Sequence, residues 1–433
     1  MSVVANQQRT FLRLLGALRS HWHTDSALPA RIQSLLARNR QFGARDRRLY
    51  RELIYTAIRY LPWIEPLLDR ERERAVRIVA WLAPDLRETS RFRSETCGDW
   101  PPSATLAERA AFLDVAPDAV LPGWFRAECP ELFVSPELDS QVARAPLWLR
   151  IQSSDTSAVE TEFSDRGWHW RQSDVLPSAW CMLDEADVTR TTAYRSGAIE
   201  IQDLGSQLVL ESVGVVAGGR WLDGCAGAGG KTLQLARLLG KDGAVDAYDV
   251  RPAALDELAV RARRATAVGI SSPPAGAGRL PSPHVETSGE LEIRGNGGAA
   301  TIRLRATAPP PGDIYDGVLV DSPCSGSGTW RRAPHLKWTT TPETIADRRR
   351  VQASLLAQYA PNVRRGGLLV YATCSVARSE NQSVVTDFLA THPEFESAPL
   401  QHRFGFSGAP GELTILPARF STDGFFVAAL RRR

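Results

Sequence analysis

The second half of the chain alternates strand-like and helical segments, and this order constrains the fold more than any other feature. From residue 202 onward, short apolar runs typical of buried strands are each followed by a segment that favours a helix. The expected strands are 220–223, 244–249, 315–320 and 367–371, and the expected helices between them are 231–239, 252–267 and 346–360. Strands that alternate with helices favour a parallel sheet with right-handed crossovers. The region is therefore predicted to be an α/β domain that binds its ligands at the carboxyl edge of the sheet.

A glycine-rich turn joins the first of these strands to its helix, in the sequence Asp-Gly-Cys-Ala-Gly-Ala-Gly-Gly-Lys-Thr at 223–232. Glycine lets the backbone turn tightly and approach a ligand closely. Asp249 ends the next strand, where an acid typically accepts hydrogen bonds from ribose hydroxyls. The turn has neither a strict GxGxxG pattern nor a Walker lysine at the right spacing. A nucleoside cofactor without phosphates therefore fits better, and S-adenosylmethionine is the common one.

Two cysteines follow two later strands, each in a short polar motif. Cys324 lies in Asp-Ser-Pro-Cys-Ser-Gly-Ser-Gly (321–328), and Cys374 lies in Tyr-Ala-Thr-Cys-Ser (371–375). A thiolate that adds to carbon 6 of a pyrimidine makes carbon 5 able to attack a sulfonium methyl group, and a second thiol could assist the final release. A lone buried cysteine is more often structural. Two thiols at strand ends, with the carboxyl of Asp321 beside one of them, favour this chemistry instead.

The N-terminal part of the chain has a different character. Apolar residues at helical spacing predict helices over much of 9–85, and many arginines cluster between residues 31 and 93. Arginine suits bidentate contacts to phosphate, so this region is either a basic RNA-docking module or a plain scaffold with an arginine bias. A second basic segment with an aromatic residue follows Cys324; it suits either a nucleic-acid backbone and base or a solvated face. It contains Arg331, Arg332, Lys337 and Trp338.

Composition excludes several classes of protein. The 433 residues carry a net charge of only +3, and no apolar run approaches the ~18 residues of a membrane span. The first residues lack the pattern of a signal peptide, so a cytoplasmic protein without membrane contact is expected. The six cysteines form neither a CxxC pair nor a zinc-like spacing, which predicts free thiols and no metal site. Residues 271–298 are rich in Pro, Gly and Ser and predict a long loop or flexible insertion.

Together these motifs resemble the RNA cytosine-C5 methyltransferase family, in particular the bacterial Fmu/Sun-type (RsmB/NOP-like) ribosomal RNA enzymes. The resemblance covers roughly residues 200–433 and lies in DGCAGAGGKT (223–232), YDV (248–250), DSPCSGSGTWRRAPHLKW (321–338), GGLLVYATCSVARSEN (366–381) and DGFFVA (423–428). It implies a Rossmann-like S-adenosylmethionine-dependent methyltransferase domain at 201–433. A helical NusB-like RNA-binding domain at 1–140 and a small α/β linker subdomain at 141–200 would precede it.

The resemblance also implies roles for residues. Cys374 would attack carbon 6 of the target cytosine, Cys324 would help release the product, and Asp321 would hydrogen-bond the base and border the cofactor. The residues that would hold S-adenosylmethionine are Cys225, Ala226, Gly227, Ala228, Gly229, Gly230, Lys231, Asp249 and Asp321. The partner would be RNA, most of all 16S-type ribosomal RNA, with the target base turned out of its stack and no obligate protein partner.

The sequence departs from the family pattern in two places. Ala228 stands where the family usually has proline, and the stretch 302–309 lacks the acid that the family carries near the adenine. Alternatives therefore remain: a transfer RNA methyltransferase, or a non-catalytic RNA-binding assembly factor that retains the fold. A DNA cytosine methyltransferase is opposed by the Thr-Cys-Ser motif at 373–375. A small-molecule methyltransferase explains neither the basic helices nor the two thiols.

Overall fold

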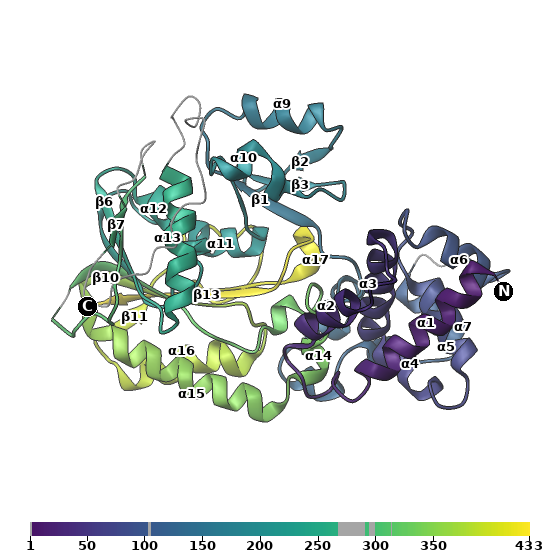
Figure 1. The fold of residues 1–433 in the computed structure, drawn as a ribbon. Helices are drawn as coiled ribbons and strands as arrows, with labels where there is room; N and C mark the ends of the chain where they lie inside the picture. Colours follow the sequence, from purple (N-terminus) through teal and green to yellow (C-terminus); the bar gives the residue numbers. More distant parts are fainter. Residues whose placement is uncertain (1, 103–104, 267–290, 294–298, 313) are drawn as a thin grey trace. The chain divides into compact units, whose positions relative to one another are not determined.

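The computed structural model describes residues 2–102, 105–266, 291–293, 299–312 and 314–433 (Figure 1). These residues form two compact units, which are described separately. The first unit comprises residues 1–144 and 329–344, and the second comprises 145–328 and 345–433. Most of the proposed insertion at 271–298 lies outside the described residues. Segment 329–344, which the sequence places within the 201–433 domain, belongs instead to the first unit.

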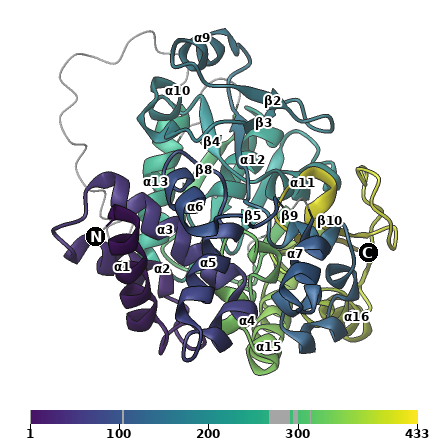
Figure 2. The same ribbon diagram turned by 90° about the vertical axis from the view of Figure 1, so that its right-hand side faces the viewer.

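The first unit is helical (Figure 2). Its helices are α1 (Val3–Leu18), α2 (Leu28–Arg38), α3 (Ala44–Arg59), α4 (Leu61–Ile64), α5 (Arg72–Leu82), α6 (Ser90–Cys97), α7 (Leu106–Leu113), α8 (Glu137–Ser140) and α14 (Leu336–Thr339). Single 3₁₀ turns lie at Glu65–Leu67, Pro117–Val120, Gly123–Ala127 and Pro130–Phe133. Helix α3 contacts α1, α2, α4 and α5 and so forms the centre of the unit.

The expected helical faces are the buried ones. Helix α3 buries Leu53, Ile54, Ala57 and Ile58, which recur at helical spacing. Its first turn is fixed by Asp46, whose carboxylate accepts a hydrogen bond of 3.1 Å from the backbone N–H of Gly43. The stretch 65–82, within the region expected to be helical, is only partly an α-helix. Pro66 lies in a 3₁₀ turn, and α5 begins only at Arg72.

The second unit contains two sheets. The smaller sheet is antiparallel, in the order β2-β3-β1-β4, and includes Trp170 and Trp180. Its strands are β1 (Leu147–Ile151), β2 (Trp170–Gln172), β3 (Ala179–Met182) and β4 (Ile199–Ile201), with helices α9 (Ser157–Asp165) and α10 (Thr192–Arg195). Trp180 is buried and its ring stacks on Trp170 at 5.5 Å. These tryptophans therefore serve the core of the subdomain.

Within the described residues the larger sheet has nine strands, in the order β11-β13-β10-β9-β5-β6-β8-β7, with β12 paired to β13. The strands are β5 (Gly219–Asp223), β6 (Gly243–Ala247), β7 (Leu291–Ile293), β8 (Thr301–Leu304), β9 (Tyr315–Asp321), β10 (Val363–Thr373), β11 (Phe395–Ser397), β12 (Glu412–Ile415) and β13 (Phe425–Arg432). The neighbours β10, β9, β5, β6 and β8 are all parallel, and β13 pairs antiparallel with β10.

Helices cover both faces of this sheet (Figure 1). On one face lie α11 (Leu204–Val213), α12 (Gly230–Leu239) and α13 (Pro252–Thr266), and on the other lie α15 (Pro342–Tyr359) and α16 (Gln382–Thr391). The short helix α17 (Pro417–Phe420) precedes β13. A parallel sheet covered on both faces is the α/β architecture that the alternating pattern predicted. The Rossmann-like prediction is therefore confirmed.

Candidate active site

The site lies where four adjacent parallel strands end. In the sheet the strands follow one another as β10, β9, β5 and β6, so their carboxyl ends meet at one edge. Cys374 directly follows β10, Asp321 ends β9, Asp223 ends β5, and Asp249 lies two residues past β6. The strand order thus brings together motifs that lie far apart in the sequence.

The glycine turn is held in shape from both sides. Gly229 has φ of 87°, and a Cβ there would lie 2.1 Å from the Leu258 side chain, so the turn requires glycine. The turn's carbonyl oxygens accept hydrogen bonds from two arginines, Ala228 from Arg261 at 2.6 Å and Gly230 from Arg150 at 3.0 Å. With Ala228 in place of the family's usual proline, the turn is therefore still held by hydrogen bonds from two arginines.

Asp249 faces this turn, as an acid that binds a ribose should. Its Oδ2 accepts a hydrogen bond of 2.9 Å from the backbone N–H of Gly227. Burial opposes ionisation, but the hydrogen bonds from Arg251 and Gly227 outweigh it, so the pKa of Asp249 is lowered. A buried ionised carboxylate beside a close-approach glycine turn suits the hydroxyls of a nucleoside. The residues present thus fit S-adenosylmethionine.

The two sequence-predicted thiols meet. The sulfur atoms of Cys324 and Cys374 are 3.3 Å apart, which is a hydrogen-bond distance and far longer than the ~2.05 Å of a disulfide. The hydrogen bond from Cys324 lowers the pKa of Cys374, and Lys231 lowers it further, although burial opposes both. The pKa of Cys324 is raised by that same hydrogen bond and by burial. Within the pair a negative charge is therefore favoured on Cys374 rather than on Cys324.

A buried cation lies beside the thiols. Lys231 Nζ is 2.9 Å from Asp321 Oδ2 and 5.1 Å from the ring centre of Phe425. Lys231 is 7% exposed, whereas the side chain of Asp321 is 30% exposed and can still meet a ligand. Behind this pair, burial raises the pKa of Asp223 to about 7. The ammonium group of Lys231 is thus a positive charge that helps to lower the pKa of Cys374 and that forms an ion pair with Asp321.

Sequence reasoning missed the residue that joins the two cysteine loops. Glu380 is fully buried, and its carboxylate accepts hydrogen bonds from Ser325 N–H (2.8 Å), Ser325 Oγ (2.5 Å), Ser375 Oγ (2.6 Å) and Gln352 Nε2 (3.0 Å). Ser325 follows Cys324 and Ser375 follows Cys374, so one side chain anchors both loops. A glutamate six residues after the second cysteine, in Ser-Glu-Asn, is the only signal of it in the sequence.

Three side chains of the basic segment 331–338 have hydrogen-bond partners inside the helical unit. Lys337 is fully buried and donates to the carbonyl oxygens of Gln141 (3.1 Å) and Val120 (3.4 Å). Arg331 donates to the carbonyl of Arg144 at 2.7 Å, and Trp338 to that of Ile58 at 2.7 Å. These contacts help to hold the helical unit together, and RNA binding by these three side chains stays a prediction. Arg332 alone of the four is exposed.

The acid that the family resemblance implies near the adenine is absent here. Strand β8 is followed by Arg305, whose Nη1 donates to the buried carboxylate of Asp246 at 3.0 Å. That carboxylate also accepts a hydrogen bond of 2.8 Å from the hydroxyl of Tyr315. An arginine anchored in the sheet thus stands directly after β8. Among the described residues no group of three or more His, Cys, Asp or Glu side chains is arranged to hold a metal ion, and no helix could cross a membrane.

The fold and the site define the class of the protein: a Rossmann-like methyltransferase with two thiols at the cofactor edge of its sheet. The family model described as 16S rRNA methyltransferase RsmB/F matches residues 300–431. A probable ribosomal RNA small subunit methyltransferase B of Synechocystis sp. is 31% identical over 76% of this chain and 68% of its own. The chain belongs to this RsmB/F family.

Other matches cover different shares of their own length. A probable ribosomal RNA small subunit methyltransferase B of Bacillus subtilis is 30% identical over 65% of this chain, and the match spans 58% of that relative. A solved structure titled as a methyltransferase homolog protein from Pyrococcus horikoshii aligns with a TM-score of 0.56 and 20% identity, over 76% of this chain and all of its own. At that identity the likeness concerns the fold alone.

Proposed function

We propose that the protein methylates carbon 5 of a cytosine in RNA, with S-adenosylmethionine as methyl donor and small-subunit ribosomal RNA as substrate. The observation that carries the proposal is the thiol pair, 3.3 Å apart, next to a buried Lys231–Asp321 ion pair. Family membership and the names of the relatives support ribosomal RNA over transfer RNA. The glycine turn at 223–232 suits S-adenosylmethionine, which argues against a purely non-catalytic assembly factor.

The proposed reaction begins at Cys374. Its thiolate adds to carbon 6 of the cytosine, and the Asp321 carboxylate holds the base by accepting hydrogen bonds from its amino group and, when that nitrogen is protonated, from its ring nitrogen. The electron pair pushed to carbon 5 forms the new carbon–methyl bond; the cofactor, when bound, supplies that methyl group. A base then removes the carbon 5 proton, and the electron pair of that C–H bond expels the Cys374 sulfur. The target base reaches the pocket only when turned out of its stack.

The pair geometry supports a base role for Cys324 in the release step. In the free protein its pKa is raised chiefly by the hydrogen bond to Cys374. Once the Cys374 sulfur is bonded to carbon 6 it carries no charge, so that cause disappears. Cys324 then ionises more readily and can accept the carbon 5 proton. Cys374 thus acts as the nucleophile in the first step, and Cys324 acts as the base in the release step.

The proposal is tested by transfer of labelled methyl from S-adenosylmethionine to unmodified small-subunit ribosomal RNA, with transfer RNA in parallel. The labelled RNA is digested to nucleosides, and we expect the label in 5-methylcytidine from the ribosomal substrate alone. Label only in transfer RNA would support the alternative substrate. Cofactor binding by calorimetry without any transfer would support the assembly factor.

A further inference from the structure

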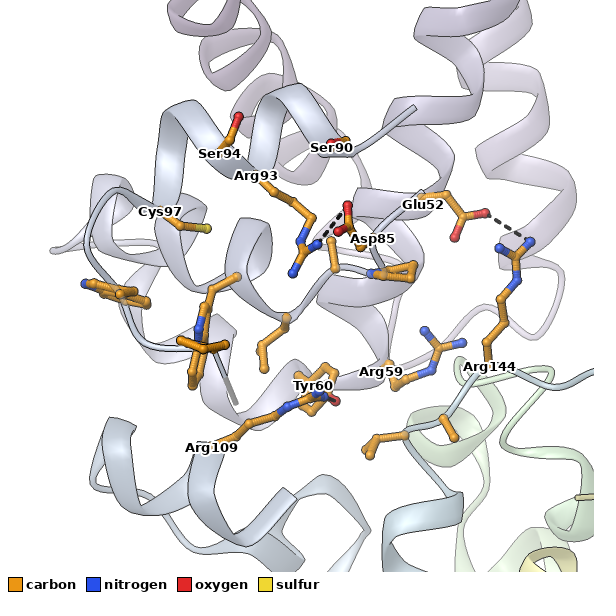
Figure 3. Close-up of a pocket in the computed structure, with 18 of the residues that line it drawn as sticks. Glu52, Arg59, Tyr60, Asp85, Ser90, Arg93, Ser94, Cys97, Arg109 and Arg144 are labelled. Atoms are coloured by element: carbon orange, nitrogen blue, oxygen red, sulfur yellow. Dashed lines mark hydrogen bonds and ion pairs between the residues drawn. The ribbon is translucent and has the colours of Figure 1, made fainter. Parts of the chain in front are cut away.

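A large cavity lies wholly in the helical unit and is lined by no residue used in the proposed reaction. Its volume of about 550 Å³ is within the ~300–1,000 Å³ typical of ligand sites. Figure 3 shows polar side chains reaching into it from α3, α6, α7 and the segment after α8. The charged residues that line it are Glu52, Arg59, Asp85, Arg93, Arg109 and Arg144.

The cavity carries an excess of positive charge, with four arginines against two acids. Arg93 pairs with Asp85 at 3.0 Å, and Arg144 reaches Glu52 only at 3.7 Å. Arg109 donates to the hydroxyl of Tyr60 at 2.9 Å. The side chains of Asp85 and Arg144 are 70% and 48% exposed, so the cavity opens to solvent.

Arg59 is the least satisfied of these groups. Its Nε is buried without a hydrogen-bond partner, and within the described residues no ion pair is formed by its guanidinium. Burial lowers the pKa of Arg59 and the like charge of Arg144 lowers it further, although Tyr60 and Glu52 act in the opposite direction. The Nε of Arg93 is also buried without a partner. Converging guanidinium groups with unused donors form a site for an anion with several oxygens, such as phosphate.

We propose that this cavity binds a backbone phosphate of the RNA substrate, with Arg59 as its main ligand. The inference rests on the proposed function for the identity of the RNA. A chain of phosphodiesters needs an open site with an excess of positive charge, and the cavity has both properties. The aromatic side chains of Tyr60, Trp81 and Trp100 form part of its wall, which suits a nucleotide better than a lone inorganic ion.

The test measures RNA binding by the full chain without cofactor, so it is independent of methyl transfer. Fluorescence anisotropy with a labelled fragment of small-subunit ribosomal RNA gives Kd at several salt concentrations. We expect Arg59→Gln to weaken binding about 10-fold, as for loss of a charged hydrogen-bonding group. The slope of log Kd against log salt concentration should fall by about 0.7, which is the change expected for the loss of one phosphate contact. Arg59→Lys should retain part of the affinity and most of the slope.

Arg74→Gln is the matched control, because Arg74 lies on α5, pairs with Glu71 at 2.9 Å and does not line the cavity. It removes the same charge and should leave Kd within about twofold. If circular dichroism shows that the Arg59→Gln variant unfolds at a lower temperature, the Arg144→Gln variant is used instead, because the Arg144 side chain is half-exposed. The same loss of RNA affinity is expected for it.

Two results would overturn the inference. One is a wild-type Kd and salt slope in a folded Arg59→Gln or Arg144→Gln variant. The other is a stabilisation of the wild-type protein by inorganic phosphate that is lost in these variants while their RNA affinity stays unchanged. That result would show that the cavity binds a free anion rather than RNA. Neither result would bear on methyl transfer by the thiol site. Conversely, if the wild-type protein bound RNA but transferred no methyl group, the proposed function would fail and this inference would stand.

Discussion

Glu380 offers the sharpest test of how the two cysteine loops are held. The carboxylate is fully buried and accepts four hydrogen bonds, from Ser325 (twice), Ser375 and Gln352. Glu380→Ala removes all four acceptor contacts, which at a net ~1 kcal/mol each amounts to about 4 kcal/mol of local stability. Glu380→Gln keeps the shape. Its amide oxygen can face the two N–H donors while its NH₂ donates to the two hydroxyls, so about 1–2 kcal/mol is expected.

Hydrogen exchange of peptides that contain residues 321–328 and 374–381 measures this directly. Because ~1.4 kcal/mol is tenfold, Glu380→Ala should reduce protection in both peptides by up to about a thousandfold, and Glu380→Gln by about tenfold. Glu257→Ala, at an exposed glutamate on α13, is the matched control and should change neither peptide. Equal effects of the Gln and Ala variants, or loss of protection in one loop alone, would refute a shared anchor.

Two further predictions concern the charges of the site. The pKa of Cys374 is lowered, so methyl transfer should fall as pH decreases through a value below the ~8.5 of a free thiol; Lys231→Gln should move this fall to higher pH, because it removes a cation that favours the thiolate. A pH–rate profile unchanged by that substitution would contradict the assignment. Asp249→Asn should weaken S-adenosylmethionine binding about tenfold in calorimetry, since an ionised acceptor for ribose hydroxyls is lost, without changing RNA affinity. Unchanged cofactor affinity would show that Asp249 is not part of the cofactor site.

The central part of the site could be predicted from sequence because it depends on topology. Alternating strands and helices imply parallel strands, and parallel strands bring their carboxyl ends to one edge. Cys324 and Cys374 follow two such strands, so their meeting at 3.3 Å required only that β9 and β10 be neighbours. The glycine turn and Asp249 follow from the same rule at β5 and β6.

Burial and loop contacts could not be predicted in this way. Lys337 lies in a polar, basic segment, and nothing in that pattern shows that its ammonium group is enclosed by backbone carbonyls of Val120 and Gln141, about 200 residues earlier. The same holds for Glu380, whose four donors come from three segments of the chain. Hydrogen bonds between loops depend on the assembled fold, which short motifs do not specify.

The two-thiol mechanism is tested most directly by a covalent RNA adduct. Wild type, Cys324→Ala and Cys374→Ala are each incubated with S-adenosylmethionine and small-subunit ribosomal RNA and resolved on a denaturing gel. We predict methyl transfer without accumulated adduct for wild type, a stable protein–RNA adduct for Cys324→Ala, and neither product nor adduct for Cys374→Ala. Methyl transfer by Cys374→Ala, or wild-type turnover without adduct by Cys324→Ala, would contradict the account.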